Sequence, residues 1–464
     1  MLFKDELMDV NVTMVDSEAI EGKKDYILLA IPYFLLMICS EIVVGVAKGK
    51  PLYRMNDTMA SLMQGSIQVL LGYWVKAIEI AAYAWVYDNY RLADLDHSSW
   101  WVWIGCLLGV DLGYYWMHRE AHEFHLLWSA HSVHHSGEDY NFATALRQGT
   151  LQSTYSWVFK LPCALLYHPV VFAQHSAMNT LYQFWIHTTL VGSLGPLERI
   201  LNTASHHRMH HRPPGNCNYA GVLIIWDIMF GTFIPEDEQK DHYGLAKQYS
   251  TFDPFWANLE HLRRMAASNQ VKDVTPMQLA KQLSKMVFKR RVKHRCQFRP
   301  LALFAPWQPP VRSLWDEPLS NKRQRYDGML AARTRLMRAY TVILFMIAMA
   351  FAVAALFSGG IVTNGEALIM QAVCCSLFVS VGRLLDGREY GDILNTLRVV
   401  ACLCLSSWLV GVVEHVQNPN KVLAVKVFQT FSAADAVGWF CVSNLRDTSS
   451  RCKKKKCKSM FFNK

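Results

Sequence analysis

Long apolar stretches, separated by shorter polar or basic segments, set the pattern along this chain. In the N-terminal part, three of them predict helices in a membrane, and the first two reach the ~20 residues that a crossing requires. They are Tyr26–Ala47, Leu62–Tyr87 and Trp100–Met117. Lys76 and Glu79 interrupt the second stretch, and their spacing predicts an ion pair on one face of the helix.

The next apolar stretch, Leu151–Leu194, contains Pro162 and Pro169. Because proline disrupts a helix interior, this stretch predicts two helices, which either enter the membrane and return or lie buried among the other helices. From Glu236 to about Arg338 the chain turns polar and basic. A helix that begins near Thr275–Pro276 is expected there, lying on the membrane surface.

Four more apolar stretches occupy the C-terminal part and predict four crossings. They are Tyr340–Phe357, Leu368–Leu385, Val399–Val416 and Val422–Val442. Four crossings return the chain to the side from which it started, and the segments that flank these stretches are both basic. The positive-inside rule therefore predicts that both flanks lie in the cytosol.

Composition agrees with a membrane protein, since apolar residues make up 52% of the chain and charged residues only 18%. The net charge of +10 gathers beside apolar stretches. This favours anionic lipid headgroups over nucleic acid as the partner, because no basic–aromatic binding module accompanies the charge. We predict an all-α, polytopic helical membrane protein that does not bind nucleic acid.

Five regions are expected along the chain. The first is polar and lacks a signal-peptide cleavage site, so internal segments must direct membrane insertion. The regions are a polar N-terminal segment (1–25), a membrane-embedded histidine-bearing domain (26–260), a basic cytosolic loop (261–338), C-terminal transmembrane helices (339–444) and a basic tail (445–464).

Histidines supply the candidate chemistry. Thirteen of the 18 fall between positions 118 and 211, and eight of these form three spaced boxes. The boxes are H-x-x-x-H at His118 and His122, H-x-x-H-H at His131, His134 and His135, and H-x-x-H-H at His207, His210 and His211. Positions i, i+3 and i+4 share a helix face, so each box can aim its imidazoles at one point. Eight imidazoles exceed the ligands of one zinc ion and predict two metals. Iron suits imidazole and oxygen chemistry, whereas zinc and copper stay open.

Other histidines fit this role less well. An isolated histidine in an apolar helix is expected to be a hydrogen-bonded core residue; these are His97, His168, His175, His261 and His415. His187 lies in an aromatic segment that could fold back over the metals, so ligation and packing both stay open. His206 precedes the third box, about 100° round the helix from His207, and is expected to support a ligand.

Glu123 directly follows the first box and could orient an imidazole, transfer a proton, bind a cofactor or simply be solvated. Several polar residues near the boxes are weaker candidates. For Glu138, Asp139 and Asn141 support of a ligand is open, and for Arg147, Gln148, Asn218, Tyr219 and Asp227 helix packing is the simpler interpretation.

The boxes and their order behind apolar helices resemble the fatty acid hydroxylase superfamily of membrane di-iron oxygenases. Strings between them resemble, more narrowly, its tetrahydrobiopterin-dependent branch that cleaves ether lipids. They are WMHREAHE (116–123), SGEDYNFATALRQ (136–148), YQFWIHT (182–188), LNTASHHRMHH (201–211) and NYAGVLIIWDIMFGTF (218–233). Two departures are Ser132, where glutamine is expected, and the proline-rich RPPGNC at 212–217.

The resemblance implies that the eight box histidines bind two irons, that His187 is an additional required histidine and that Glu123 is needed for catalysis. It implies hydroxylation of the ether-linked carbon of an alkylglycerol or lyso-alkyl phospholipid with O2 and tetrahydrobiopterin. It further implies an endoplasmic reticulum membrane protein whose site faces the cytosol. Pterin contacts and oligomeric state are not indicated. Two alternatives stay open: a fatty-acid, sphingolipid or sterol hydroxylase of the same superfamily, and a histidine-rich metal transporter.

Overall fold

The computed structural model describes residues 26–49, 52–213, 215–237, 242–268, 335–357, 364–387, 395–404, 426 and 428–440. Every regular element within these ranges is a helix, which confirms the predicted all-α class. Two compact units divide the described residues. One runs from residue 26 to Tyr249 and includes the helix that continues from Phe255, and the other combines Ser250–Pro254 with the residues from 335 onward.

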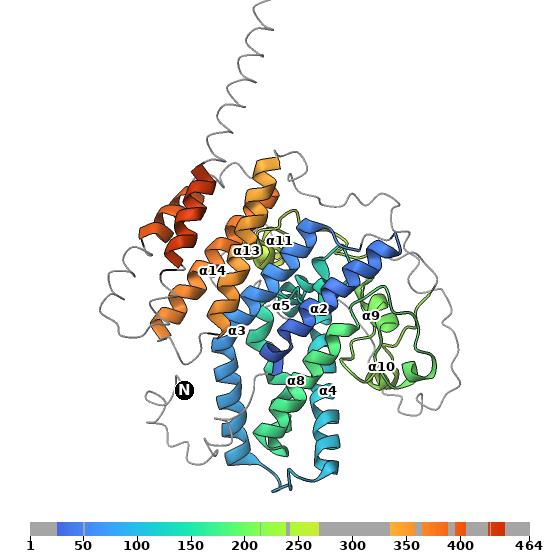
Figure 1. The fold of residues 1–464 in the computed structure, drawn as a ribbon. Helices are drawn as coiled ribbons and strands as arrows, with labels where there is room; N and C mark the ends of the chain where they lie inside the picture. Colours follow the sequence, from blue (N-terminus) through green and yellow to red (C-terminus); the bar gives the residue numbers. More distant parts are fainter. Residues whose placement is uncertain are drawn as a thin grey trace, which may run out of the picture. The chain divides into compact units, whose positions relative to one another are not determined.

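Four long helices and several short ones build the first unit (Figure 1). The long helices are α2 (Tyr26–Ala47), α3 (Met55–Tyr90), α4 (Trp100–Glu123) and α8 (Pro169–Trp185). The shorter α-helices are α5 (His125–His131), α6 (Phe142–Ala145), α7 (Ser153–Ser156), α9 (Ala204–His211), α10 (Ile225–Phe230) and α11 (Pro254–Ser268). Four 3₁₀ helices connect them, namely η1 (His134–Ser136), η2 (Thr150–Gln152), η3 (Trp157–Leu165) and η4 (Gly195–Arg199).

The two prolines of the stretch 151–194 have different effects. Pro169 begins α8, at the position where a missing N–H costs nothing, and His168 Nδ1 accepts from Val170 N at 3.3 Å. Pro162 lies inside η3, and the chain before Pro169 forms three short helical pieces instead of one helix. The expected pair of helices is therefore correct for α8 and wrong for the preceding part, because a proline interrupts the i→i−4 ladder there.

An apolar core joins α3, α4, η3 and α8, and its members include Tyr83, Cys106, Val110, Cys163 and Phe172. The predicted ion pair is present, since Lys76 Nζ lies 3.0 Å from Glu79 Oε2 on α3. This packing joins the first half of α4 and the first turn of α8, and both helices lead toward histidine-bearing segments at their C-terminal ends.

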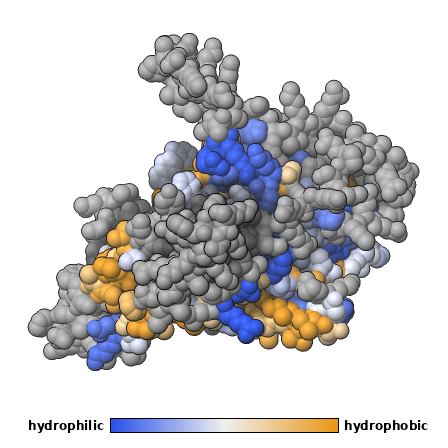
Figure 2. All heavy atoms as spheres, turned by 90° about the horizontal axis from the view of Figure 1, so that it is seen from above, coloured by the Kyte–Doolittle hydropathy of each residue, from blue (hydrophilic) through white to orange (hydrophobic). Residues whose placement is uncertain are grey.

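Four described helices are long and apolar enough to cross a membrane: Leu29–Ala47, Met55–Tyr90, Met337–Leu356 and Gly365–Asp386. The length and composition of these helices are those of a multi-pass membrane protein. On α2, Tyr33, Leu36, Val43 and Val46 are all exposed, as expected for side chains that face lipid. Figure 2 shows hydrophobic residues gathered in patches at the surface. The aromatic stretch 100–117 forms most of α4, which is not one of these four long apolar helices.

The second unit contains α13 (Arg335–Phe357), α14 (Asn364–Asp386) and helical segments at 395–404 and 428–440. The first two match the predicted stretches 340–357 and 368–385 and pack against each other. A buried ion pair joins the helical segments, because Arg398 bonds Asp435, which also accepts from Tyr340 Oη at 2.8 Å. The remainder of the last two predicted stretches, the helix near Thr275 and His415 lie outside the described residues.

Candidate metal centre

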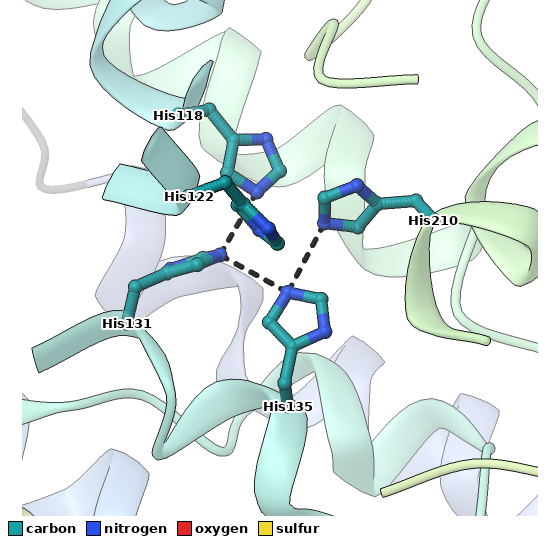
Figure 3. Close-up of side chains that lie close together, drawn as sticks. All are labelled: His118, His122, His131, His135 and His210. Atoms are coloured by element: carbon teal, nitrogen blue, oxygen red, sulfur yellow. Dashed lines mark hydrogen bonds between the residues drawn. The ribbon is translucent and has the colours of Figure 1, made fainter. Parts of the chain in front are cut away.

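Nine histidines from distant parts of the chain converge into two compact groups. The five-histidine group contains His118, His122, His131, His135 and His210, and the four-histidine group contains His134, His187, His207 and His211. Within each group, one nitrogen of every ring lies within 4.8 Å of the others. Figure 3 shows the first group, with rings from three segments pointing at a common centre. The structure thus brings together all eight box histidines and adds His187.

Each H-x-x-H-H box serves both groups, which differs from the expectation that one box aims at one point. In the second box, His131 and His135 enter the five-histidine group and His134 enters the other. In the third box, His207 and His211 enter the four-histidine group and His210 enters the first. The physical reason is that adjacent helical residues point about 100° apart, so neighbouring histidines cannot reach one centre.

Local structure places the boxes at helix ends. The first box occupies the last two turns of α4, which ends at Glu123. The second box begins at the last residue of α5 and passes through a turn into η1. The third box fills α9, and His187 follows α8 by two residues. The second box is therefore not a continuous α-helix, although Ser132 and Val133 keep helical backbone angles.

Carbonyl oxygens orient five of the nine rings by accepting from Nδ1. The acceptors are Tyr219 O for His118 (2.8 Å), Gln152 Oε1 for His131 (2.8 Å), Arg147 O for His134 (2.8 Å), Gln183 O for His187 (2.8 Å) and Cys217 O for His210 (2.7 Å). Each bond places the proton on Nδ1 and leaves a lone pair on Nε2, which faces the group. This is how metal-binding histidines are held in proteins.

The facing Nε2 atoms test whether metals fit the groups. His118 and His131 approach at 2.9 Å, and His134 and His187 at 3.3 Å, through Nε2 in both pairs. Because Nδ1 carries the proton in all four rings, both atoms of each pair are acceptors and cannot hydrogen-bond to one another. A cation between them resolves this repulsion. In addition, His211 Nε2 and His207 Nδ1 are buried without a hydrogen-bond partner. The donor set therefore fits metal ions.

Burial keeps these imidazoles neutral. It lowers the pKa of His134 to about 4 and lowers the pKa of His187, His207, His210 and His211 well below the usual value of 6.5. Neighbouring histidines lower several of these pKa values further. A proton is thus a poor occupant of either group, whereas a metal needs the neutral form of each ligand. The residues define a metal site with iron as the expected ion.

A buried polar network supports the second box. Arg147, whose carbonyl accepts from His134, has its guanidinium 2.7 Å from Asp57 Oδ1 and 3.0 Å from Ser61 Oγ on α3. Nearby, Arg54 bonds both Glu138 and Asp139 at 3.0 Å. The packing interpretation of Arg147 is therefore supported for its side chain, while its main chain positions a histidine.

Glu123 belongs to a second buried network. Its Oε1 lies 2.7 Å from Arg119 Nε, and both side chains are almost fully buried. It is not one of the nine grouped residues, and its burial contradicts the solvated alternative, while its role in orientation, proton transfer or cofactor binding stays a prediction. His206 lies outside both groups too, and His175 Nδ1 donates to Val171 O within its own helix, as expected of a core histidine.

The sequence argument missed Gln152 and Cys217 as acceptors. No motif marks Gln152, which meets His131 because the chain after Gly149 passes very close to α5. A Cβ on Gly149 would lie 2.0 Å from the carbonyl oxygen of Ala130. Cys217 acts through its main chain, which every residue carries. Only its place beside the recognised string 218–233 could have suggested it.

Together, the helices and the paired histidine groups define a membrane metalloprotein of the fatty acid hydroxylase type. The model of that family, described as fatty acid hydroxylase, matches residues 103–232, which include all nine grouped histidines. Alkylglycerol monooxygenase of Homo sapiens is 37% identical over 393 residues, which cover 84% of each chain. That of Danio rerio is 38% identical over 391 residues, or 83% of each. That of Xenopus tropicalis is 49% identical over 246 residues, which cover 52% of this chain and 55% of the relative.

The chain belongs to the alkylglycerol monooxygenase family. This confirms the resemblance that the strings between the boxes indicated. No solved structure matches the chain.

Proposed function

We propose that this chain is a membrane monooxygenase that hydroxylates the ether-linked carbon of alkylglycerols or lyso-alkyl phospholipids. The observation that carries the proposal is the pair of buried histidine groups with facing lone pairs. The names of the relatives supply the substrate class. Each group would hold one iron ion, and the bound irons would supply the activation of O2.

The reaction balances with tetrahydrobiopterin as the reductant. One oxygen atom of O2 enters the C–H bond next to the ether oxygen, and the other leaves as water. When bound, tetrahydrobiopterin would supply the two electrons and two protons that this requires. The hydroxylated carbon is a hemiacetal, whose C–O bond breaks to release a fatty aldehyde and a glycerol derivative.

The residues of this chain hold and orient the reacting parts. The nine histidines bind the metals, five of them fixed through Nδ1, and Glu123 supports the first box through Arg119. Apolar helices align the alkyl chain so that one carbon reaches the metals. The site faces the cytosol, because basic segments flank the C-terminal apolar stretches. The endoplasmic reticulum as the membrane follows from the family resemblance.

The test is an assay of the full-length protein in lipid nanodiscs with an alkylglycerol, with and without tetrahydrobiopterin, together with iron analysis. We expect fatty aldehyde only with the pterin. His134→Ala should abolish it and lower bound iron, whereas His175→Ala, whose ring bonds only within its own helix, should retain most activity. Full activity of His134→Ala, or equal loss in both variants, would contradict the assignment. Oxidation of a fatty acid or sterol instead would favour another hydroxylase, and metal uptake without lipid oxidation would favour transport.

A further inference from the structure

Asp227 is a fully buried carboxylate on α10 that does not belong to either histidine group. Its Oδ1 accepts from Tyr219 N at 2.8 Å and from Thr232 Oγ1 at 2.6 Å. Its Oδ2 accepts from Ala220 N at 2.8 Å. A carboxylate with this many donors is held in one orientation, and it fixes the main chain at 219–220 in return.

The peptide that joins Tyr219 to Ala220 connects this carboxylate to a metal-binding ring. Its N–H, on Ala220, donates to Asp227, and its C=O, on Tyr219, accepts from His118 Nδ1 at 2.8 Å. Hydrogen bonds at both ends of one amide polarise it and strengthen each other. The negative charge of Asp227 therefore makes the Tyr219 oxygen a better acceptor. A better acceptor holds the His118 ring more firmly and raises the basicity of its Nε2.

Hydrogen bonds continue from Asp227 to the other end of the first box. Thr232 Oγ1 donates to Asp227, so it accepts from Tyr115 Oη at 3.0 Å, and Tyr115 Oη accepts from Arg119 at 3.1 Å. Every donor in this series points toward the carboxylate. Arg119 also bonds Glu123, the residue after His122. The positive charge of Arg119 thus offsets the buried charge of Asp227 through an unbroken series of donors.

The same segment serves only one of the two groups. Besides Tyr219, Cys217 presents its carbonyl oxygen to His210 Nδ1 at 2.7 Å. His118 and His210 both belong to the five-histidine group. In the four-histidine group, His134 donates to Arg147 O and His187 to Gln183 O, and both of these acceptors lie on other segments.

We propose that Asp227 is a positioning residue of the five-histidine group, acting through the 219–220 peptide on His118. The arrangement corresponds to a carboxylate–histidine–metal triad with a peptide inserted between the carboxylate and the ring. The inference rests on the proposed function in one respect, namely that both groups bind metal. It goes beyond that function by assigning a residue that controls one metal and leaves the other unchanged.

Asp227→Asn is the test, because asparagine keeps the shape but replaces one acceptor with a donor that faces an N–H. The full-length protein is loaded with ⁵⁷Fe, and the two irons are measured by competition with a chelator and by Mössbauer spectroscopy. We expect one of the two irons to bind about 10- to 100-fold more weakly. The spectrum of the other iron should be unchanged. Thr232→Val removes one donor and keeps the carboxylate, so it should weaken the binding of the same iron by a smaller factor than Asp227→Asn does.

Asp111→Asn is the matched control. Asp111 is equally buried and holds the following residues of the loop through Val222 N and Leu223 N at 2.9 Å and Trp226 Nε1 at 3.0 Å. Within this loop, the carbonyls that accept from grouped histidines lie on Cys217 and Tyr219, upstream of these amides. Asp111→Asn should therefore leave both affinities within about threefold of the original chain.

Three results would overturn the inference: unchanged affinities and spectra in Asp227→Asn, equal weakening of both irons, or the same selective weakening in Asp111→Asn. If Asp227→Asn does not fold, Thr232→Val decides the question by the same criteria. Failure of the proposed function looks different, because the original chain itself would then lack the iron pair or leave alkylglycerol unoxidised.

Discussion

Replacing Gln152 by methionine should weaken the binding of one of the two proposed metals. Gln152 Oε1 accepts from His131 Nδ1 at 2.8 Å, and of the five carbonyl oxygens that accept from a grouped histidine it is the one that belongs to a side chain. The others are main-chain carbonyls, which substitution cannot remove. Gln152 therefore offers direct access to the support of a ligand without changing the ligand itself.

The size of the effect follows from the contact that is lost. Removing the partner of a buried donor costs about 1–3 kcal/mol. At 1.4 kcal/mol per tenfold change, this corresponds to roughly a 5- to 140-fold weaker affinity. The effect should be confined to the five-histidine group, to which His131 belongs. Gln152→Glu keeps an acceptor and adds a negative charge, so affinity should be equal to or above that of the original chain.

Chelator competition on the full-length protein, with iron counted per chain, measures both variants. Gln68→Met is a matched control, since Gln68 Nε2 bonds Ser153 Oγ, the residue after Gln152, at 2.9 Å and bonds no histidine among the described residues. Original affinity for both metals in Gln152→Met would refute the reasoning. Equal losses in Gln152→Met and Gln152→Glu would indicate a steric effect instead of a lost acceptor.

Two further predictions concern the histidines themselves. The metal-free protein should lose stability as pH falls below about 6.5, because burial holds the pKa of His134 near 4 when folded, so the unfolded chain binds the proton more tightly. His134 alone contributes about 3 kcal/mol to the free energy of unfolding, and this contribution is fully present above pH 6.5 and lost toward pH 4. A melting temperature that stays constant from pH 7.5 to 5.5 would contradict this. Although the two residues are adjacent, His210→Ala should remove the iron of the five-histidine group and His211→Ala that of the four-histidine group. If the iron that remains gives the same Mössbauer spectrum in both variants, the division into two groups is wrong.

Much of the fold could be predicted from the apolar pattern, and the exceptions have physical causes. The stretch 26–47, which only Glu41 interrupts with a charge, coincides with α2, because an apolar segment in a membrane must satisfy its backbone internally. The stretch 62–87 corresponds to α3, which begins earlier, at Met55, since polar residues before an apolar run can continue a helix. The short pieces at 150–165 were not predicted, because hydrophobicity alone does not distinguish a long helix from 3₁₀ turns around a proline.

The sequence predicted which histidines form the site, but it did not predict how they divide into two groups. Box spacing indicated the eight histidines, since clustered imidazoles in a membrane protein need a compensating partner. The sequence left His187 open, and the structure places it with His134 and His207, because the turn after α8 brings it back to the centre. The acceptors behind the rings are mostly carbonyl oxygens, which leave no trace in the side-chain pattern.

The division of the boxes explains how one H-x-x-H-H motif can contribute to both histidine groups. The residues at i and i+4 lie one above the other on a helix, while i+3 is displaced by about 100° from i+4. One box therefore presents two imidazoles to one group and one imidazole to the other, as His207 and His211 do relative to His210. Two such boxes, reciprocally arranged, give each group a pair from one box and a single ligand from the other. The first box completes the five-histidine group and His187 completes the four-histidine group, so the second and third boxes each connect the two groups through one short segment of chain.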